Sequence, residues 1–171
     1  MKTLKTFFYI FLGCVLLGLT SCNNDDDNGG SSVNPGQAIV NANMTGALNK
    51  NFKADAATST CVNMQGLIMI VGTKVESGTT VSTFSISLPQ GIAVGTYTAN
   101  QLEDMTLPGT FTYIDASNNA VGYVAGVEDN NNFSVKITKS ETGKLEGTFE
   151  GEMLNTEAQK INVTGDFKAA Y

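Results

Sequence analysis

The sequence predicts an antiparallel all-β domain of about nine or ten short strands, closed into a barrel or packed as a two-sheet sandwich. Three observations predict it: apolar and polar residues alternate in several segments, turn residues separate these segments at short intervals, and no part of residues 37–171 keeps a helical period. A strand points successive side chains to opposite faces, so each alternating segment has one apolar and one polar face. Antiparallel sheets with one solvated face show this pattern.

The clearest alternation lies at the C-terminal end, in residues 132–138, 144–154 and 159–171. A turn containing Gly143 joins the first two segments, which predicts a hairpin over 132–154. The last two segments carry glycine among their inward residues. Glycine inside a strand often marks a bend or a bulge, and this favours a barrel slightly over a sandwich. These inward glycines are Gly147, Gly151 and Gly165.

Seven further strands are expected upstream of the predicted hairpin. Their ranges are 42–48, 51–54, 66–73, 82–88, 95–99, 110–115 and 121–127. Residues 66–73 (GLIMIVGT) are apolar on both faces, which indicates a central or covered strand.

Residues 1–21 have the organisation of a bacterial secretory signal. A positively charged start precedes an apolar run at 7–19, which is too short for a comfortable membrane span of about 20 residues. The run ends in LTSC at 19–22, which resembles the lipobox of bacterial lipoproteins. The resemblance implies cleavage between Ser21 and Cys22 and attachment of lipid to Cys22. An ordinary secretory peptide with a chance cysteine is the alternative.

An acidic cluster, Asp25, Asp26 and Asp27, follows the cysteine and is similar to the surface-export signal of Bacteroidota lipoproteins. A solvated acidic linker is the alternative interpretation. Residues 28–36 (NGGSSVNPG) have the composition of a flexible linker. The expected organisation is a signal peptide at 1–21, an acylated cysteine and linker at 22–36, and a single β domain at 37–171. The expected location is the outer membrane, with the lipid as anchor and the domain exposed on the cell surface.

Residues 42–171 resemble the DUF6252-like domains of unknown function found in Bacteroidota lipoproteins. The resemblance is carried by a first hairpin at 44–54, a Gly-Thr-Tyr triplet at 95–97, a Gly-Thr-Phe strand at 147–149 and a final Gly-x-Phe at 165–167. It implies a β domain in the cell envelope and transfers no catalytic residues.

Charge argues against nucleic acid as a partner. Two of the ten basic residues lie in the signal peptide, so eight remain against sixteen acidic residues, and all of the basic residues are lysines. Nucleic-acid binding relies on clustered basic residues, so this class of function is excluded.

Composition also argues against catalysis, and we expect no enzyme activity and no cofactor. The chain has no histidine, which removes the commonest general base and metal ligand. Phosphate-binding and nucleophile-elbow motifs are missing as well. Of three cysteines, one leaves with the signal peptide and Cys22 is acylated, so Cys61 remains. A buried Cys61 is favoured over a reactive or intermolecular thiol.

Weaker candidate sites remain. Glu146, Glu150 and Glu152 share one face of a predicted strand, where a charged, soluble surface is favoured over a pair of glycosidase carboxylates. Glu128 and Asp129 form a weak calcium candidate beside three asparagines, although a plain polar turn is favoured.

Tyr113 and Tyr123 flank a predicted turn and offer a modest sugar-binding patch, although a core or interface role is favoured. The leading hypothesis is a non-enzymatic surface lipoprotein that binds an unknown protein or glycan or serves as an accessory component of the envelope. The alternatives are a lipocalin-like carrier with a small apolar ligand inside its barrel and, less favoured, a small hydrolase.

Overall fold

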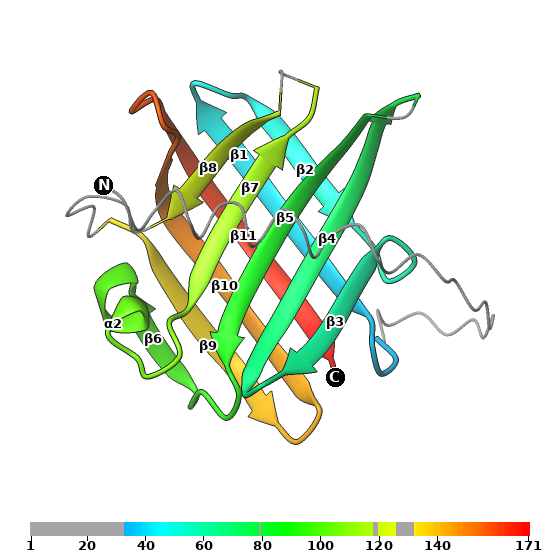
Figure 1. Ribbon diagram of the computed structural model, residues 1–171, viewed down its shortest axis with the longest axis vertical. Helices are drawn as coiled ribbons and strands as arrows, with labels where there is room; N and C mark the ends of the chain where they lie inside the picture. The colour runs from blue at the N-terminus through cyan, green and yellow to red at the C-terminus, as the bar shows by residue number, and fades with distance from the viewer. Residues whose placement is uncertain (1–32, 79, 118–119, 126–131) are drawn as a thin grey trace. The chain divides into compact units, whose positions relative to one another are not determined.

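Eleven β-strands and one short helix make up most of what the computed structural model describes, namely residues 33–78, 80–117, 120–125 and 132–171 (Figure 1). The elements are β1 (Ala38–Gly46), β2 (Lys50–Ala54), β3 (Ser59–Met64), β4 (Leu67–Ser77), β5 (Thr80–Pro89), β6 (Gly95–Thr98), α2 (Ala99–Glu103), β7 (Thr110–Asp115), β8 (Val121–Ala125), β9 (Ser134–Glu141), β10 (Lys144–Leu154) and β11 (Lys160–Ala170). The predicted all-β class is confirmed. Within these ranges, no helix has the length and apolar character needed to cross a membrane.

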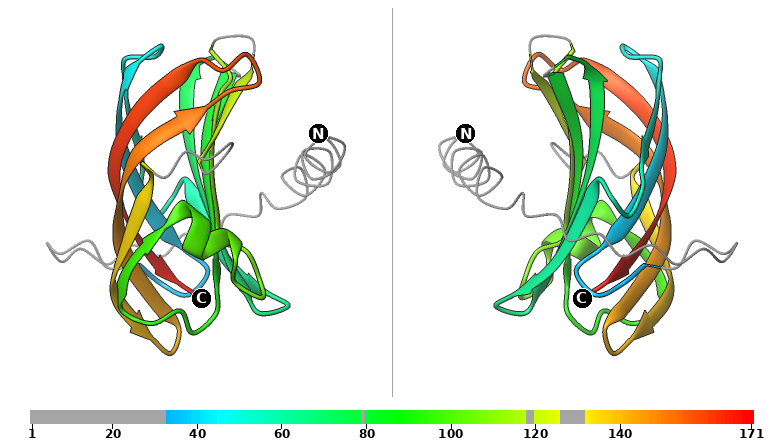
Figure 2. Two further views of the ribbon diagram at one scale, coloured as in Figure 1. Left: turned by 90° about the vertical axis from the view of Figure 1, so that its left-hand side faces the viewer. Right: turned by 90° about the vertical axis from the view of Figure 1, so that its right-hand side faces the viewer.

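A single antiparallel sheet contains all eleven strands. Nine of them follow the path β2-β1-β11-β10-β8-β7-β5-β4-β3, while β9 pairs with β10 and β6. The first part of β10 pairs with β9, and its last residues, Met153 and Leu154, pair with β8. The sheet coils until its two ends approach each other, which gives a nearly closed barrel (Figure 2).

The barrel is completed along a seam, defined here as the gap where β1 and β2 face β3 and β4. At one end, Gln37 forms an isolated bridge with Thr60, and the Cys61 N–H donates to the Gly36 carbonyl at 2.9 Å. Further along, a Cβ placed on Gly72 would lie 3.0 Å from the Cβ atoms of Val40 and Ala54. The two edges therefore touch through close packing, without a continuous ladder of backbone hydrogen bonds between them.

Aromatic side chains fill the described interior. Phe84 lies with its ring centroid 5.0 Å from that of Phe149, and the rings of Phe111 and Phe133 are 4.9 Å apart. Burial of each such side chain stabilises the fold by about 1.5–3 kcal/mol relative to exposure. The largest fully buried side chains are Tyr113, Tyr123, Phe52, Phe84, Phe111, Phe133, Phe167, Met44, Ile68, Ile70, Ile86 and Leu88.

The glycines predicted to mark bends lie where strands pack most closely. A Cβ on Gly165 would overlap the Asn41 carbonyl oxygen and the ring of Phe149, and one on Gly147 would lie 2.7 Å from the Lys136 carbonyl oxygen. Gly151 has φ +135°, a conformation that favours glycine. The sheet thus curves tightly where β10 changes partner from β9 to β8.

Two details of the predicted secondary structure were wrong. The strand β3 was missed, which is one reason why the count is eleven and not nine or ten. The strand expected at 95–99 ends at Thr98, because the Thr98 side chain accepts from the Gln101 N–H and the Gln101 side chain accepts from the Thr98 N–H, which together cap α2. The strand expected to be central or covered, β4, lies between β3 and β5 and pairs with both.

Candidate functional site

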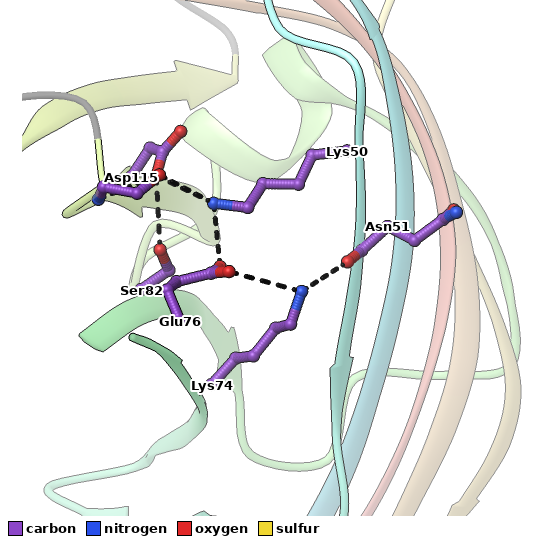
Figure 3. A network of polar contacts seen from close by, with 7 residues as sticks. Lys50, Asn51, Lys74, Glu76, Ser82 and Asp115 are labelled. Atoms are coloured by element: carbon purple, nitrogen blue, oxygen red, sulfur yellow. Dashed lines mark hydrogen bonds and ion pairs between the residues drawn. The ribbon is translucent and has the colours of Figure 1, made fainter. Parts of the chain in front are cut away.

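A cluster of polar side chains lies inside one end of the barrel, where β2, β4, β5 and β7 meet (Figure 3). We call Lys50, Glu76, Ser82, Asp115 and Ser117 the polar cluster. Lys50 begins β2, Glu76 is near the end of β4, Ser82 is near the start of β5, and Asp115 ends β7. Four separate strands therefore bring these residues together at the seam.

Strand phase explains why these residues point inward. Lys50 lies on the same face of β2 as the buried residues Phe52 and Ala54. Asp115 likewise lies on the same face of β7 as the buried residues Phe111 and Tyr113. Since side chains two residues apart share a face, the same alternation that buries the aromatic rings also carries the charges into the barrel end.

Lys50 is held between two carboxylates. Its Nζ lies 2.8 Å from Glu76 Oε1 and 3.0 Å from Asp115 Oδ1. The side chains of Lys50, Glu76 and Asp115 are 14%, 13% and 1% exposed, so water screens this contact weakly.

The two oxygens of Asp115 have different surroundings. Oδ1 accepts hydrogen bonds from Lys50 Nζ, from the Ser117 N–H at 3.1 Å, from Ser117 Oγ at 2.6 Å and from Ser82 Oγ at 3.3 Å. Oδ2 is buried and has no hydrogen-bond partner among the described residues, and the same holds for the hydroxyl of Tyr113. An unsatisfied buried polar group costs about 1–3 kcal/mol, more when it is charged, so this oxygen calls for an explanation.

The mutual attraction of the charges outweighs burial at all three ionisable groups. Burial alone favours the neutral amine, but hydrogen bonds with Glu76 and Asp115 hold the pKa of Lys50 above its usual value. Burial likewise favours the neutral acids, yet the contact with Lys50 lowers the pKa of Glu76. Hydrogen bonds from Ser117 and Lys50 lower the pKa of Asp115. The ordinary state of the cluster is therefore an ion pair with a second carboxylate beside it.

A second lysine extends the contacts toward the edge strand. Lys74 Nζ donates to the Asn51 carbonyl at 2.9 Å and lies 3.5 Å from Glu76 Oε2. Because Asn51 is on β2 and Lys74 is on β4, this contact bridges the seam.

A hollow of about 300 Å³ lies elsewhere, on the outer face of β6, β9, β10 and β11. We call it the outer hollow. The side chains at Thr96, Lys136, Thr148, Glu150 and Thr164 belong to the exposed face of these strands. The full lining is Thr96, Ser134, Lys136, Thr148, Phe149, Glu150, Thr164 and Gly165. This surface offers hydroxyl groups, one amine and one carboxylate to a ligand.

Several predicted sites lie outside the described residues: Ser21 and Cys22, Asp25 to Asp27, and the calcium candidates Glu128 and Asp129. Elsewhere in the described chain, no three acidic or cysteine side chains are grouped so as to hold a metal ion.

Cys61, Tyr113 and Tyr123 are buried in the core, which is the role favoured for each of them from the sequence. Cys61 is buried on β3, and burial raises the pKa of its thiol to about 12. Tyr113 and Tyr123 are core residues and form no sugar-binding surface.

Of the three glutamates predicted to share one face, two form ion pairs and the third lines the outer hollow. Glu152 pairs with Lys160 at 3.1 Å, and Glu146 lies 3.8 Å from Lys139. Glu150 lines the outer hollow.

Sequence reasoning missed the polar cluster. The signal was available in part: in each of the four strands that form the cluster, a charged or hydroxyl residue continues the inward phase of apolar neighbours. The order of the strands in the sheet brings these four strands together, and no local sequence pattern contains that order.

No family model, no curated protein and no solved structure matches the chain.

Proposed function

We propose that the chain is a lipid-anchored, non-enzymatic binding protein on the surface of a bacterial outer membrane, and that it holds a polar ligand such as a short glycan in the outer hollow. The observation that carries the proposal is the filling of the barrel. The described strands direct large aromatic and aliphatic side chains inward, and these side chains are fully buried.

Because side chains fill the interior of the barrel, a ligand site on its outer face is favoured. Barrels of about eight strands hold either packed side chains or one small ligand. The fold is compatible with the carrier alternative, but Phe84, Phe111 and Phe149 occupy its centre with their rings in contact. The outer hollow has the smallest volume usual for small-molecule sites, about 300–1,000 Å³.

The lining of the outer hollow suits a hydroxylated ligand. Thr96, Thr148 and Thr164 carry hydroxyl groups that both donate and accept. Lys136 adds a donor and Glu150 adds an acceptor of opposite charge. Sugars present closely spaced hydroxyl groups, which such a mixture can satisfy.

Binding to the outer hollow is tested by NMR titration of the acyl-free chain with a panel of envelope and host glycans. Shifts confined to β6, β9, β10 and β11 are expected, and Thr148→Arg is expected to abolish them by filling the hollow. Thr45→Arg, at an exposed position of β1, serves as the control and should bind normally. Absence of shifts with every glycan, or shifts that Thr148→Arg leaves unchanged, would contradict the proposed site.

Anchoring is tested separately at Cys22. Cys22→Ala should abolish labelling by an alkyne fatty acid and leave unprocessed precursor or released protein. Continued labelling and membrane fractionation of the variant would contradict the anchor.

Surface exposure is tested at the acidic cluster. Replacing Asp25, Asp26 and Asp27 with Ala should preserve lipidation but protect the domain from proteinase added to intact cells. Unchanged cleavage of the variant would mean that the cluster is a linker only.

A further inference from the structure

We propose that Lys50 and Asp115 become joined by an isopeptide bond in the folded protein, with Glu76 relaying the protons. Three features of the polar cluster point to this modification. The primary amine of Lys50 contacts the carboxyl groups of both Glu76 and Asp115, the three side chains are largely removed from water, and strands far apart in the sequence hold them in place.

Geometry places the reacting groups at contact distance. Lys50 Nζ is 3.0 Å from Asp115 Oδ1, so the amine lies against the carboxyl group whose carbon it would attack. Holding two groups at about 3–3.5 Å replaces a rare collision with an intramolecular step. Lys50 starts β2 and Asp115 ends β7, so the folded sheet, and not local flexibility, sets this approach.

Asp115 has the asymmetry that an acyl-transfer centre needs. Ser117 donates to Oδ1 through its N–H and its hydroxyl, and Ser82 donates through its hydroxyl. These donors stabilise the negative charge that develops on Oδ1 when nitrogen attacks. Oδ2 has no hydrogen-bond partner among the described residues, so no existing contact has to break before it takes up protons and leaves as water.

The proton count balances within the polar cluster. Glu76 takes a proton from the Lys50 ammonium and, once its side chain turns toward Asp115, passes the proton to Oδ2, which gives a neutral amine and a neutral acid. The amine lone pair forms the N–C bond to Cγ, and the C=O π electrons move to Oδ1. Glu76 then moves a second proton from nitrogen to the Oδ2 hydroxyl, the C–Oδ2 bond breaks, and the C=O bond reforms. One ammonium and one carboxylate have become one amide and one water, and Glu76 is again a carboxylate.

The modification would lock the seam covalently. β2 is an end strand of the sheet, and its outer edge faces β4 without a continuous ladder. A bond between β2 and β7 would fix that edge by a link that reduction does not break. Such a link suits a domain exposed outside the cell, because an end strand that cannot open resists proteinases.

Mass spectrometry of the full chain tests the proposal. The chain is purified from its bacterial host, denatured and cleaved with chymotrypsin, which can release peptides 49–52 and 114–123. The expected species is the two peptides linked, lighter than their sum by the mass of one water. Recovery of the two unlinked peptides from folded protein would overturn the proposal and leave a permanent ion pair.

Variants separate chemistry from folding. Lys50→Arg keeps the charge and should leave the peptides unlinked, and Glu76→Gln should greatly slow linkage in a chain that still melts cooperatively. Asp115→Asn should yield the same linked species through loss of ammonia in place of water. Lys74→Arg, outside the reacting trio, should link fully. Normal linkage in Lys50→Arg or in Glu76→Gln would contradict the assigned roles.

Discussion

The two sides of the barrel are built by different means. On one side, β1, β11 and β10 form a continuous wall in which β11 makes nine residue pairs with β1 and eleven with β10. On the other side, the described part of the seam has an isolated bridge between Gln37 and Thr60, close packing at Gly72 and, at the opposite end, side-chain contacts of Lys50 and Lys74.

The wall and the seam are therefore stabilised by different interactions. Backbone ladders repeat at every residue of the wall, so the loss of one side chain leaves most of the pairing intact. The seam depends on a few particular groups, and each can be replaced by mutation. Substitutions in the wall should therefore act through packing and pairing, whereas substitutions in the seam should act through charge and protonation.

Removal of residues 166–171 should have the largest effect and unfold the whole domain. These residues complete β11, which lies between β1 and β10, so both neighbours would lose part of their pairing. Loss of buried Phe167 alone costs about 3–5 kcal/mol. The total stability of such a domain is about 5–15 kcal/mol. Thermal melting of the 37–165 fragment, recorded by circular dichroism, tests this. A cooperative transition with a Tm within a few degrees of that of the complete domain would show that β11 is dispensable.

The wall was predictable from sequence because its pattern is local. The strand expected at 144–154 coincides with β10, and the one expected at 159–171 contains β11. Phe149, Val163 and Phe167 alternate with exposed or half-buried polar residues, and the register follows from burying that face.

The seam was less predictable because local patterns do not say which strands meet there, and its edge strand β3 has an irregular pattern. β3 buries Ser59 and Cys61 but exposes Val62 and Met64, so its apolar residues do not share one face. Lys50 and Asp115 meet across 65 positions of sequence. Only the strand order, which depends on long-range pairing, brings these two together. For the same reason, the outer hollow was not predicted.

Within the wall, Gly165→Ala should destabilise the domain by about 1–3 kcal/mol. The added methyl group would overlap the Asn41 carbonyl oxygen and the Phe149 ring, so β1 or β10 must shift. Gly95→Ala is the matched control, because its methyl group would meet atoms no closer than 3.6 Å. Urea unfolding measures both variants. Equal stability of the two would show that the wall tolerates a side chain at this crossing.

At the seam, the stability of the domain should fall as pH rises above about 9, partly through Cys61. Burial raises the pKa of this thiol to about 12 from an ordinary value of 9.0. A folded-state pKa above the unfolded one gives stability that is complete below pH 9 and is lost as pH rises toward 12. At pH 10 the loss is about 1.4 kcal/mol.

Urea unfolding at pH 8 and pH 10 checks this loss. The fall in stability for the natural chain should exceed that for Cys61→Ala, which lacks the thiol. Identical falls in both chains would contradict a buried, protonated thiol.

The smallest effect is expected for Lys74→Met, which should cost about 0.2–1 kcal/mol, as is typical of exposed ion pairs. Lys74 bridges the seam through the Asn51 carbonyl and Glu76, but its side chain is 30% exposed and well screened. The loss should shrink further in 1 M salt, where charges are screened within about 3 Å. Lys53→Met, at an exposed position of β2, the strand that Lys74 contacts, provides the control for a lost positive charge. Because Lys74 lies outside the reacting trio, the Lys50–Asp115 link should form normally in the variant. A loss of stability above about 2 kcal/mol that persists in 1 M salt would contradict the expectation that Lys74 makes only a small, screened contribution at the seam.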